Sequence, residues 1–268
     1  MSKDLARLLW EARSLGHTID ASDIQAPKTG LEAYAVQEAI VSLSGLARVG
    51  YKVGSTSKEA QRHLGTKEPG AGALLQPYVY GSPANVSLVA DHMPAVEGEF
   101  AFRLAKDLPP RQQAYAYDEV VAGIGELAGA IEIVGTRFAG GLAGKGRLLT
   151  TADGGVNIGL VVGEWTPFAG QDLREHEVTM LINGERKGYG CGSRALENPL
   201  NVLHWLANHL SERRLGLWKG DIVSTGTCTG LDAVAGGDVV LADFGELGTV
   251  ELRLSTATST LARGHHRG

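Results

Sequence analysis

Two glutamates stand one residue apart inside an apolar run of the sequence. The segment AVEGEFAFRL, residues 95–104, surrounds Glu97 and Glu99 with residues that favour a β-strand. In a strand, residues two apart point to the same face, so these two carboxylates are predicted to lie side by side. Like charges at this spacing repel each other unless a cation, a shared proton or bulk water compensates them.

A third glutamate has a similar setting. Glu132, in AIEIVG, lies between two isoleucines, and in a strand it would point away from both. Three carboxylates from two strands, together with waters and substrate oxygens, would form the all-oxygen octahedral shell suited to Mg²⁺ or Mn²⁺. Spacing alone leaves a second interpretation open, in which these glutamates lie on the solvated face of half-exposed strands.

The composition limits the class of protein. The chain has 268 residues, 43% of them hydrophobic, so it can bury one large core. The net charge of −5 and the scattered basic residues argue against nucleic acid or an anionic membrane as partner and favour a small molecule. Only Cys191 and Cys228 are cysteines, and the amino terminus lacks an apolar signal core, which predicts a cytoplasmic protein. No stretch reaches the roughly 20 apolar residues that span a bilayer.

The hydrophobic pattern predicts a helical beginning followed by a strand-rich body. Apolar residues at helical spacing predict helices over residues 2–15, 30–44, 118–129 and 199–214. Between and after them, short runs of β-branched residues end at Gly, Pro and Asp turns and predict a mixed, mainly antiparallel sheet. The predicted fold class is therefore α+β, with helices packed around a core built from sheet.

We expect three parts along the chain. They are an N-terminal helical region with a leading strand over residues 1–75, a catalytic β-rich domain over residues 76–262, and a flexible tail over residues 263–268.

Other motifs that could carry chemistry do not have the required spacing. The glycines of GIGELAG are one residue too far apart for a dinucleotide fingerprint, and GLAGKGRL lacks the first glycine and the final Ser or Thr of a phosphate loop. His204 and His209 are five residues apart, so on one helix they point in different directions, and packing or surface roles are expected for them. The carboxylates remain the best candidates for chemistry.

An ordered series of segments resembles one known group of enzymes. The segments are GYKVGSTSKEAQRHLG, EGEFAF, AIEIVGTR, TADGGVNIGLVVG, ENPLNVLHWLANHL and GDIVSTGTCTG. In this order they resemble the 2-hydroxypenta-2,4-dienoate (2-keto-4-pentenoate) hydratases and 2-oxo-3-hexenedioate decarboxylases of the fumarylacetoacetate hydrolase superfamily. The resemblance extends from about Gly30 to about Leu254, and it implies the superfamily's β-roll with flanking helices, and a homo-oligomer.

The resemblance also implies roles for individual residues. Glu97 and Glu99 match the group's paired metal ligands, and Glu132 matches its third acidic ligand, for Mg²⁺ or Mn²⁺. Lys52 matches the active-site lysine, with an exposed strand lysine as the alternative. Asp153 falls at a motif near the pocket, where a turn-forming Asp before glycines is equally acceptable.

A late segment resembles the part of the group that contacts the substrate carboxylate. Thr225, Gly226 and Thr227 match it, and the resemblance implies that their hydroxyl and backbone N–H groups hold an anion there. The end of a strand would explain the same residues.

The implied activity is a metal-dependent hydratase of aromatic-compound catabolism. Such an enzyme adds water to a 2-hydroxy-2,4-dienoate (2-oxo-4-enoate) and forms a 4-hydroxy-2-oxo acid. The same metal site could instead serve a 2-oxo-3-hexenedioate (4-oxalocrotonate) decarboxylase or a C–C hydrolase of the fumarylacetoacetate hydrolase type, since fold alone does not separate these reactions.

Two departures from the pattern affect the order of these alternatives. Gln76 and Pro77 stand where the hydratases often carry an acidic residue, which leaves the proton relay unidentified. The histidine that precedes the paired glutamates of the hydrolases is missing, and His92 lies farther away. We therefore place the hydratase first, the decarboxylase second and the hydrolase third, with a 2-oxo acid binding protein as the non-enzymatic alternative.

Overall fold

Two β-sheets form the body of the protein in the computed structural model, which describes residues 2–257. Within these residues the larger sheet has nine strands: β2 (Gly70–Leu75), β1 (Arg48–Gly54), β11 (Ile222–Thr227), β5 (Ala95–Leu104), β6 (Ile124–Val134), β7 (Asn157–Val162) and β3 (Val79–Gly81) in order, with β12 (Asp232–Ala233) beside β5 and β8 (Thr166–Pro167) beside β6. The smaller sheet has five: β10 (Glu185–Cys191), β9 (Glu177–Ile182), β13 (Val239–Asp243), β14 (Thr249–Thr256) and β4 (Ala84–Leu88). Most pairs are antiparallel, whereas β1–β11, β3–β7 and β4–β14 are parallel.

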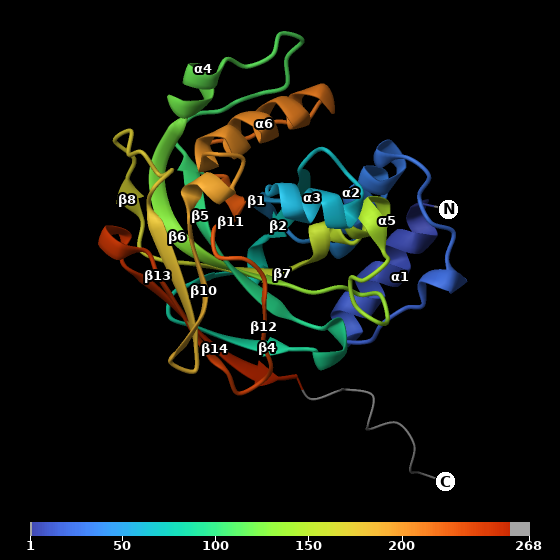
Figure 1. Ribbon diagram of the computed structural model, residues 1–268. Helices are drawn as coiled ribbons and strands as arrows, with labels where there is room; N and C mark the ends of the chain where they lie inside the picture. The colour runs from blue at the N-terminus through green and yellow to red at the C-terminus, as the bar shows by residue number, and fades with distance from the viewer. Residues whose placement is uncertain (1, 258–268) are drawn as a thin grey trace.

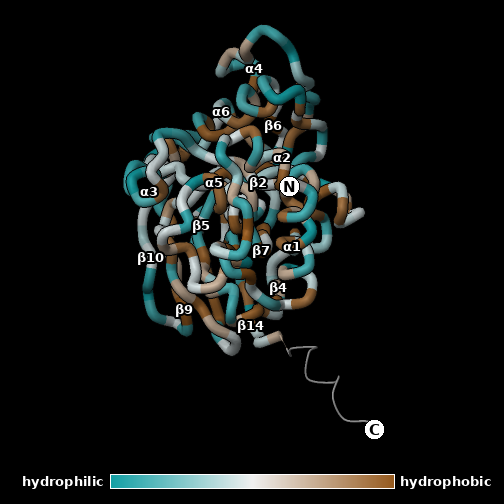
Figure 2. Tube along the Cα trace, turned by 90° about the vertical axis from the view of Figure 1, so that its right-hand side faces the viewer, coloured by the Kyte–Doolittle hydropathy of each residue, from teal (hydrophilic) through white to brown (hydrophobic). Residues whose placement is uncertain are grey.

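Helices cover two regions of these sheets. They are α1 (Ser2–Leu15), α2 (Gly30–Ser44), α3 (Lys58–Leu64), α4 (Tyr117–Val121), α5 (Gly146–Ala152) and α6 (Pro199–Glu212). Figure 1 shows α1, α2, α3 and α5 gathered on one side, while α6 and α4 lie together at another. In Figure 2 the hydrophobic residues run mainly along the strands, whereas α3 and the chain beside α4 are largely hydrophilic. Mixed sheets with flanking helices confirm the predicted α+β class.

Local signals explain where the long helices begin and end. Thr29 accepts a hydrogen bond from the Glu32 N–H at the start of α2, and Gly45 takes the left-handed conformation after its end. Asn198 caps α6 in the same way, with Pro199 in its first turn. The helices predicted over residues 2–15 and 30–44 are confirmed, and the helix predicted over residues 199–214 ends at Glu212.

The two faces of the larger sheet have different contents. On one face, Phe100 and Phe102 of β5 belong to the main hydrophobic core, which extends to Met180 and Leu252 of the smaller sheet. The opposite face carries a separate cluster of mostly small apolar side chains: Leu74, Ala101, Ala128, Ala130, Leu160 and Val162. Because strand residues alternate between faces, Glu97 and Glu99 share the second face with Ala101.

The helix predicted over residues 118–129 is wrong. Only Tyr117–Val121 are helical, and Ile124–Val134 form β6, paired along its length with β5 and with β7 beyond it. The apolar residues of this segment fit a helical period as well as a buried strand, and pairing on both edges decides in favour of the strand. The glycines permit this, since at Gly129 a Cβ would overlap the ring of Phe244.

Gly129→Ala is expected to destabilise the protein by about 1–3 kcal/mol, the usual cost of adding a carbon to a packed core. The Phe244 ring that it would displace is fully buried. Urea unfolding measures the effect. Gly81→Ala in β3 is the matched control, because its Cβ would meet nothing within 4 Å, and a change within about 0.5 kcal/mol is expected there. Equal stability of both variants would contradict the close packing of β6 on Phe244.

The division of the chain at residues 75 and 76 stays a prediction. The leading strand and its neighbour, β1 and β2, pair within the larger sheet together with strands from the second part. The end of the expected catalytic domain and the expected tail over residues 263–268 lie outside the described residues. Within residues 2–257, no helix has the length and apolar character needed to cross a membrane.

Candidate metal centre

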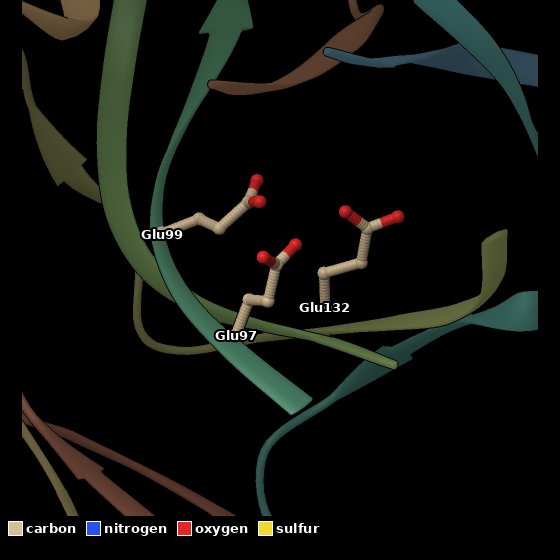
Figure 3. A group of neighbouring side chains, drawn as sticks. All are labelled: Glu97, Glu99 and Glu132. Carbon is tan, nitrogen blue, oxygen red and sulfur yellow. The ribbon is translucent and has the colours of Figure 1, made fainter. Parts of the chain in front are cut away.

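Three glutamate side chains meet on one face of the larger sheet. Glu97 of β5 lies directly opposite Glu132 of β6, and Glu99 follows two residues along β5. One carboxylate oxygen from each residue lies within 4.8 Å of the other two, and Figure 3 shows the three carboxylates turned toward one another. Glu99 and Glu132 are fully buried, and Glu97 is partly exposed. The structure thus brings together all three residues that the sequence suggested as metal ligands.

Lys52 of β1 joins this cluster. Its Nζ lies 3.1 Å from Oε2 of Glu132, and its side chain is buried. Glycines surround it, since a Cβ at Gly54 would lie 2.9 Å from Nζ, and Cβ atoms at Gly72 and Gly155 would lie 3.2 and 3.3 Å from Cδ. Side chains at these positions would push the lysine away from Glu132.

A β-bulge in β11 directs two further donors at Glu99. The pairing of β11 with β5 shifts between Ser224 and Thr227, and Gly226 between them has φ of +89°. As a result the Gly226 N–H donates to Glu99 Oε2 at 2.9 Å instead of joining the ladder, and Ser224 Oγ donates to the same oxygen at 2.5 Å. The other carboxylate oxygen of Glu99, Oε1, therefore stays available to a ligand.

The unpaired oxygens of the cluster fit a divalent cation. Oε1 of Glu99 is buried without a hydrogen-bond partner, and Oε2 of Glu132 accepts no hydrogen bond and has only its ion pair with Lys52. Buried carboxylate oxygens without partners are costly, and they are the ligands that Mg²⁺ and Mn²⁺ prefer. The donor set therefore suits such an ion.

Burial and mutual repulsion change the pKa values in the cluster. Burial, followed by the charge of Glu132, raises the pKa of Glu97 to about 7. The same effects, with repulsion from Glu97 added, raise the pKa of Glu99 well above its usual value. Burial opposes the charged form of Lys52, but attraction by the three glutamates outweighs it and raises the lysine pKa. One lysine thus faces three carboxylates, and a divalent cation would replace the protons that they otherwise hold.

The metal-free protein is expected to lose stability as the pH rises from about 4.5 to 7. Glu97 has an ordinary pKa of 4.5 when unfolded and about 7 when folded, so the folded state binds more protons in this window and unfolding becomes easier with rising pH. The loss amounts to roughly 3 kcal/mol, at 1.36 kcal/mol per pKa unit. Urea unfolding at pH 5 and pH 8 in the presence of chelator measures it. Glu97→Gln should reduce the dependence, while Glu99, whose pKa is also raised, keeps part of it. Stability that rises with pH would contradict the expectation.

Asp153 lies in a buried ion pair next to the cluster. Its Oδ1 accepts a hydrogen bond from Arg137 Nε at 2.5 Å, and its Oδ2 accepts from Thr136 Oγ1 and from the Arg137 N–H. Both oxygens are therefore occupied by protein donors. These contacts favour a role in holding the chain at Arg137, and a direct catalytic role for Asp153 stays a prediction.

The polar groups of the Thr225–Thr227 segment are directed at protein atoms. Thr225 Oγ1 donates to the Phe100 carbonyl at 2.8 Å. Thr227 Oγ1 donates to the Gly230 carbonyl and accepts from the Gly230 N–H. Contact of this segment with a substrate carboxylate stays a prediction.

Three neighbours of the cluster were missed in the sequence. Ser224 lies opposite Lys52 in the β1–β11 register, and the alternation within DIVSTGT could have placed it on the face of the glutamates. Asn157 donates from Nδ2 to Glu132 Oε1 at 2.8 Å, and no sequence pattern indicated this contact. The Thr56 hydroxyl is buried without a hydrogen-bond partner, against Gly226.

The two positions with unexpected residues lie in an exposed turn. Gln76 and Pro77 are exposed in the 3₁₀ turn η2 (Gln76–Tyr78). They follow directly after β2 (Gly70–Leu75), whose Gly72 packs on the stem of Lys52. The identity of the proton relay at this segment stays a prediction.

The histidines considered in the sequence have packing roles. A ring nitrogen of His92 lies 2.9 Å from the His17 carbonyl, and one of His204 lies 2.8 Å from the Tyr115 carbonyl. His209 stacks on Trp205, and burial lowers its pKa to about 4.

Comparison with known proteins agrees with this geometry. Residues 48–255 match the family "Fumarylacetoacetate (FAA) hydrolase C-terminal". The chain is 31% identical to the 2-keto-4-pentenoate hydratase of Paraburkholderia xenovorans, with 92% of this chain and 93% of that protein covered. It is 29% identical to the 2-oxo-hept-4-ene-1,7-dioate hydratase of Escherichia coli, with 93% and 96% covered.

A solved structure extends the similarity to three dimensions. The 4-oxalocrotonate decarboxylase from Pseudomonas putida G7, complexed with magnesium and adipate, superposes with a TM-score of 0.86 at 26% identity, covering 94% of this chain and 97% of that one. Matches of this extent, in sequence and in fold, mean that the chain belongs to the fumarylacetoacetate hydrolase family, on the branch of the 2-keto-4-pentenoate hydratases.

Proposed function

We propose that the protein is a metal-dependent hydratase that adds water to a 2-hydroxy-2,4-dienoate (2-oxo-4-enoate) and forms a 4-hydroxy-2-oxo acid in aromatic-compound catabolism. The observation that carries the proposal is the group of three glutamates beside Lys52, two of them fully buried, with two oxygens that have no hydrogen-bond partner. Curated relatives named 2-keto-4-pentenoate hydratase and 2-hydroxyhexa-2,4-dienoate hydratase, each 31% identical to this chain, support the substrate class.

In this proposal Glu97, Glu99 and Glu132 hold Mg²⁺ or Mn²⁺. The magnesium and calcium complexes of the decarboxylase neighbour support a divalent ion. When bound, the ion would act as a Lewis acid that polarises the 2-oxo group and favours the enolate beside it. Ser224 and Gly226 fix the orientation of Glu99, since both donate to its Oε2.

Lys52 is the proposed proton donor and acceptor. The reaction requires the 2-hydroxyl proton to leave and a proton to arrive at C5, which gives the conjugated 2-oxo-3-enoate. Water then adds at C4 while a proton arrives at C3. Nζ of Lys52 lies 3.1 Å from Glu132, and the three glutamates raise its pKa, so without metal the group favours its protonated form and can donate. A divalent cation on those carboxylates would offset their charge and lower the lysine pKa toward the range in which Nζ can also accept a proton.

Asp153 and the Thr225–Thr227 segment keep supporting roles in the proposal. Asp153 begins the turn whose Gly155 packs on the Lys52 stem, so it would hold Lys52 in place through the backbone. The segment from Thr225 to Thr227 would meet the substrate carboxylate through the Thr227 hydroxyl, because the Gly226 N–H holds Glu99 and the Thr225 hydroxyl is bonded to the Phe100 carbonyl.

Decarboxylation of 2-oxo-3-hexenedioate is the second candidate. The observation in its favour is the superposition with 4-oxalocrotonate decarboxylase at a TM-score of 0.86. The same polarised 2-oxo group would stabilise the enolate left after carbon dioxide departs, so the metal centre suits both reactions.

Turnover assays test the proposal and separate the two candidates. Freshly generated 2-hydroxypenta-2,4-dienoate and 2-oxo-3-hexenedioate are supplied with Mg²⁺, with Mn²⁺ and with chelator, and loss of the dienol absorbance is followed together with carbon dioxide. Metal-dependent loss without carbon dioxide is the expected result. Carbon dioxide release would instead indicate the decarboxylase, and no reaction with either substrate would contradict both and leave hydrolysis or 2-oxo acid binding.

The proposal includes a cytoplasmic homo-oligomer. Both cysteines, Cys191 and Cys228, are free thiols, which supports a reducing compartment. The family resemblance supports an assembly of identical chains. Light scattering after size-exclusion chromatography would contradict the assembly if it gave the mass of a single 28.2 kDa chain.

A further inference from the structure

Each oxygen of Glu132 has its own neighbour. Lys52 Nζ lies 3.1 Å from Oε2, and Asn157 Nδ2 donates to Oε1 at 2.8 Å. We propose that Asn157 is a positioning residue that sets the rotation of the Glu132 carboxylate in the metal centre, and that α1 supports Asn157 through Arg13. This inference rests on the proposed metal site.

A β-bulge brings Asn157 to the correct face. Glu132 pairs with Leu160, and Ile133 pairs with Gly159, but Val134 pairs with Asn157 because the register shifts by one residue. In a regular strand residue 158, two before Leu160, would share the face of Glu132, and residue 157 would point away. The extra residue reverses this, so the Asn157 amide reaches the carboxylate.

Two arginines hold the backbone of the bulge. Arg13 donates from Nη1 to the Asn157 carbonyl at 2.5 Å and from Nη2 to the Ile158 carbonyl at 2.7 Å. Arg137 Nη1 donates to the same Asn157 carbonyl at 3.1 Å. Carbonyls at a bulge leave the ladder and need other donors, so these contacts stabilise the irregular backbone that aims Asn157.

Arg13 connects a distant part of the chain to this position. It lies near the end of α1 (Ser2–Leu15), outside the residues 48–255 that match the family, and its guanidinium stacks over the Tyr78 ring at 4.0 Å. A helix outside the matched segment thus contacts the strand that carries Asn157. The amino-terminal helix is in this way part of the support of the metal centre.

Metal affinity tests the role of Asn157. Asn157→Leu keeps the size of the side chain without its N–H group, and Asn157→Ala leaves space, so both are expected to raise the Mn²⁺ dissociation constant by about 10–100-fold, the effect of losing an outer-shell partner. Isothermal titration calorimetry measures the constant, and circular dichroism of the metal-free variants checks the fold. With Mn²⁺ at saturation, the electron paramagnetic resonance spectrum should change because Glu132 is free to rotate.

Several outcomes would overturn the assignment. Mn²⁺ affinity within about twofold of wild type in both variants would mean that Asn157 only stabilises β7. Weak binding by the leucine variant alone would mean that steric conflict, and not the lost hydrogen bond, is responsible. If the wild-type protein binds no Mn²⁺, the proposed metal site is overturned as well. If the wild-type protein binds Mn²⁺ and both Asn157 variants bind it equally well, only this inference is overturned.

The contribution of α1 is tested through Arg13. Arg13→Met is expected to raise the Mn²⁺ dissociation constant by about twofold to thirtyfold, in the range of mutations that act through a neighbour. Arg7→Met is the matched control on the same helix, because Arg7 is exposed and forms its ion pair with Glu11 of that helix, and it should leave the constant unchanged. In the Asn157→Leu background Arg13→Met should add nothing, and additive losses would show that Arg13 does not act through Asn157.

Discussion

Glu99→Gln is expected to weaken Mn²⁺ binding by more than about 100-fold, since outer-shell partners alone account for 10–100-fold. The variant removes a charged ligand oxygen from a cluster in which Oε1 of Glu99 has no other partner. Calorimetry with Mn²⁺ measures the loss.

The fold of this variant should remain intact. A glutamine oxygen can still accept from Ser224 Oγ and the Gly226 N–H. Loss of one charge also removes the burial cost and the repulsion that together raise the pKa of Glu99. The chelated variant is therefore expected to unfold at the same or a higher temperature than chelated wild type at pH 8. Glu126→Gln, on the same sheet but paired with Arg103, is the control for metal affinity. If Glu99→Gln keeps wild-type affinity, Glu99 is not a ligand.

Lys52→Met is expected to lower turnover by about 10²–10⁴-fold, the range of a general acid or base. Metal affinity should not fall, because the ammonium 3.1 Å from Glu132 competes with the ion for that carboxylate. The measurement combines steady-state rates at saturating Mg²⁺ with calorimetry on the same preparation.

Two further variants show whether Lys52 moves a proton. Lys52→Arg keeps a positive charge but cannot release a proton at neutral pH, so it should not restore turnover. Lys28→Met removes an exposed lysine in the turn before α2 and should behave as wild type. Full activity of Lys52→Met would assign Lys52 to packing, and recovery in Lys52→Arg would assign it a purely electrostatic role.

Periodic elements were predictable because their signals are local. The caps of α2 and α6 and the alternation of β5 lie within a few residues of sequence, and these elements form where they were expected. The start of β6 was not predictable in this way, because the spacing of its apolar residues fits both a helix and a buried strand. Its pairing with β5 and β7, which lie elsewhere in the chain, decides its conformation.

Some residues of the candidate site were likewise predictable from local sequence, and others were not. Glu97, Glu99, Glu132 and Lys52 could be selected from the sequence, because buried charges stand out in apolar strands and the ordered motifs resemble a known family. By contrast, Asn157 was not predictable, since a register shift turns its side chain to the face of Glu132.

For this protein the sequence by itself determined the residue types of the centre, the face that the paired glutamates share and the family. The tertiary structure alone decided which donors complete the centre. The bulges at Gly226 and Asn157 redirect an N–H group and an amide toward the carboxylates, and Arg13 reaches the second bulge from a helix 144 residues away in the chain. Such contacts depend on strand register and on the packing of distant elements, and neither is encoded in the local periodicity of the residues involved.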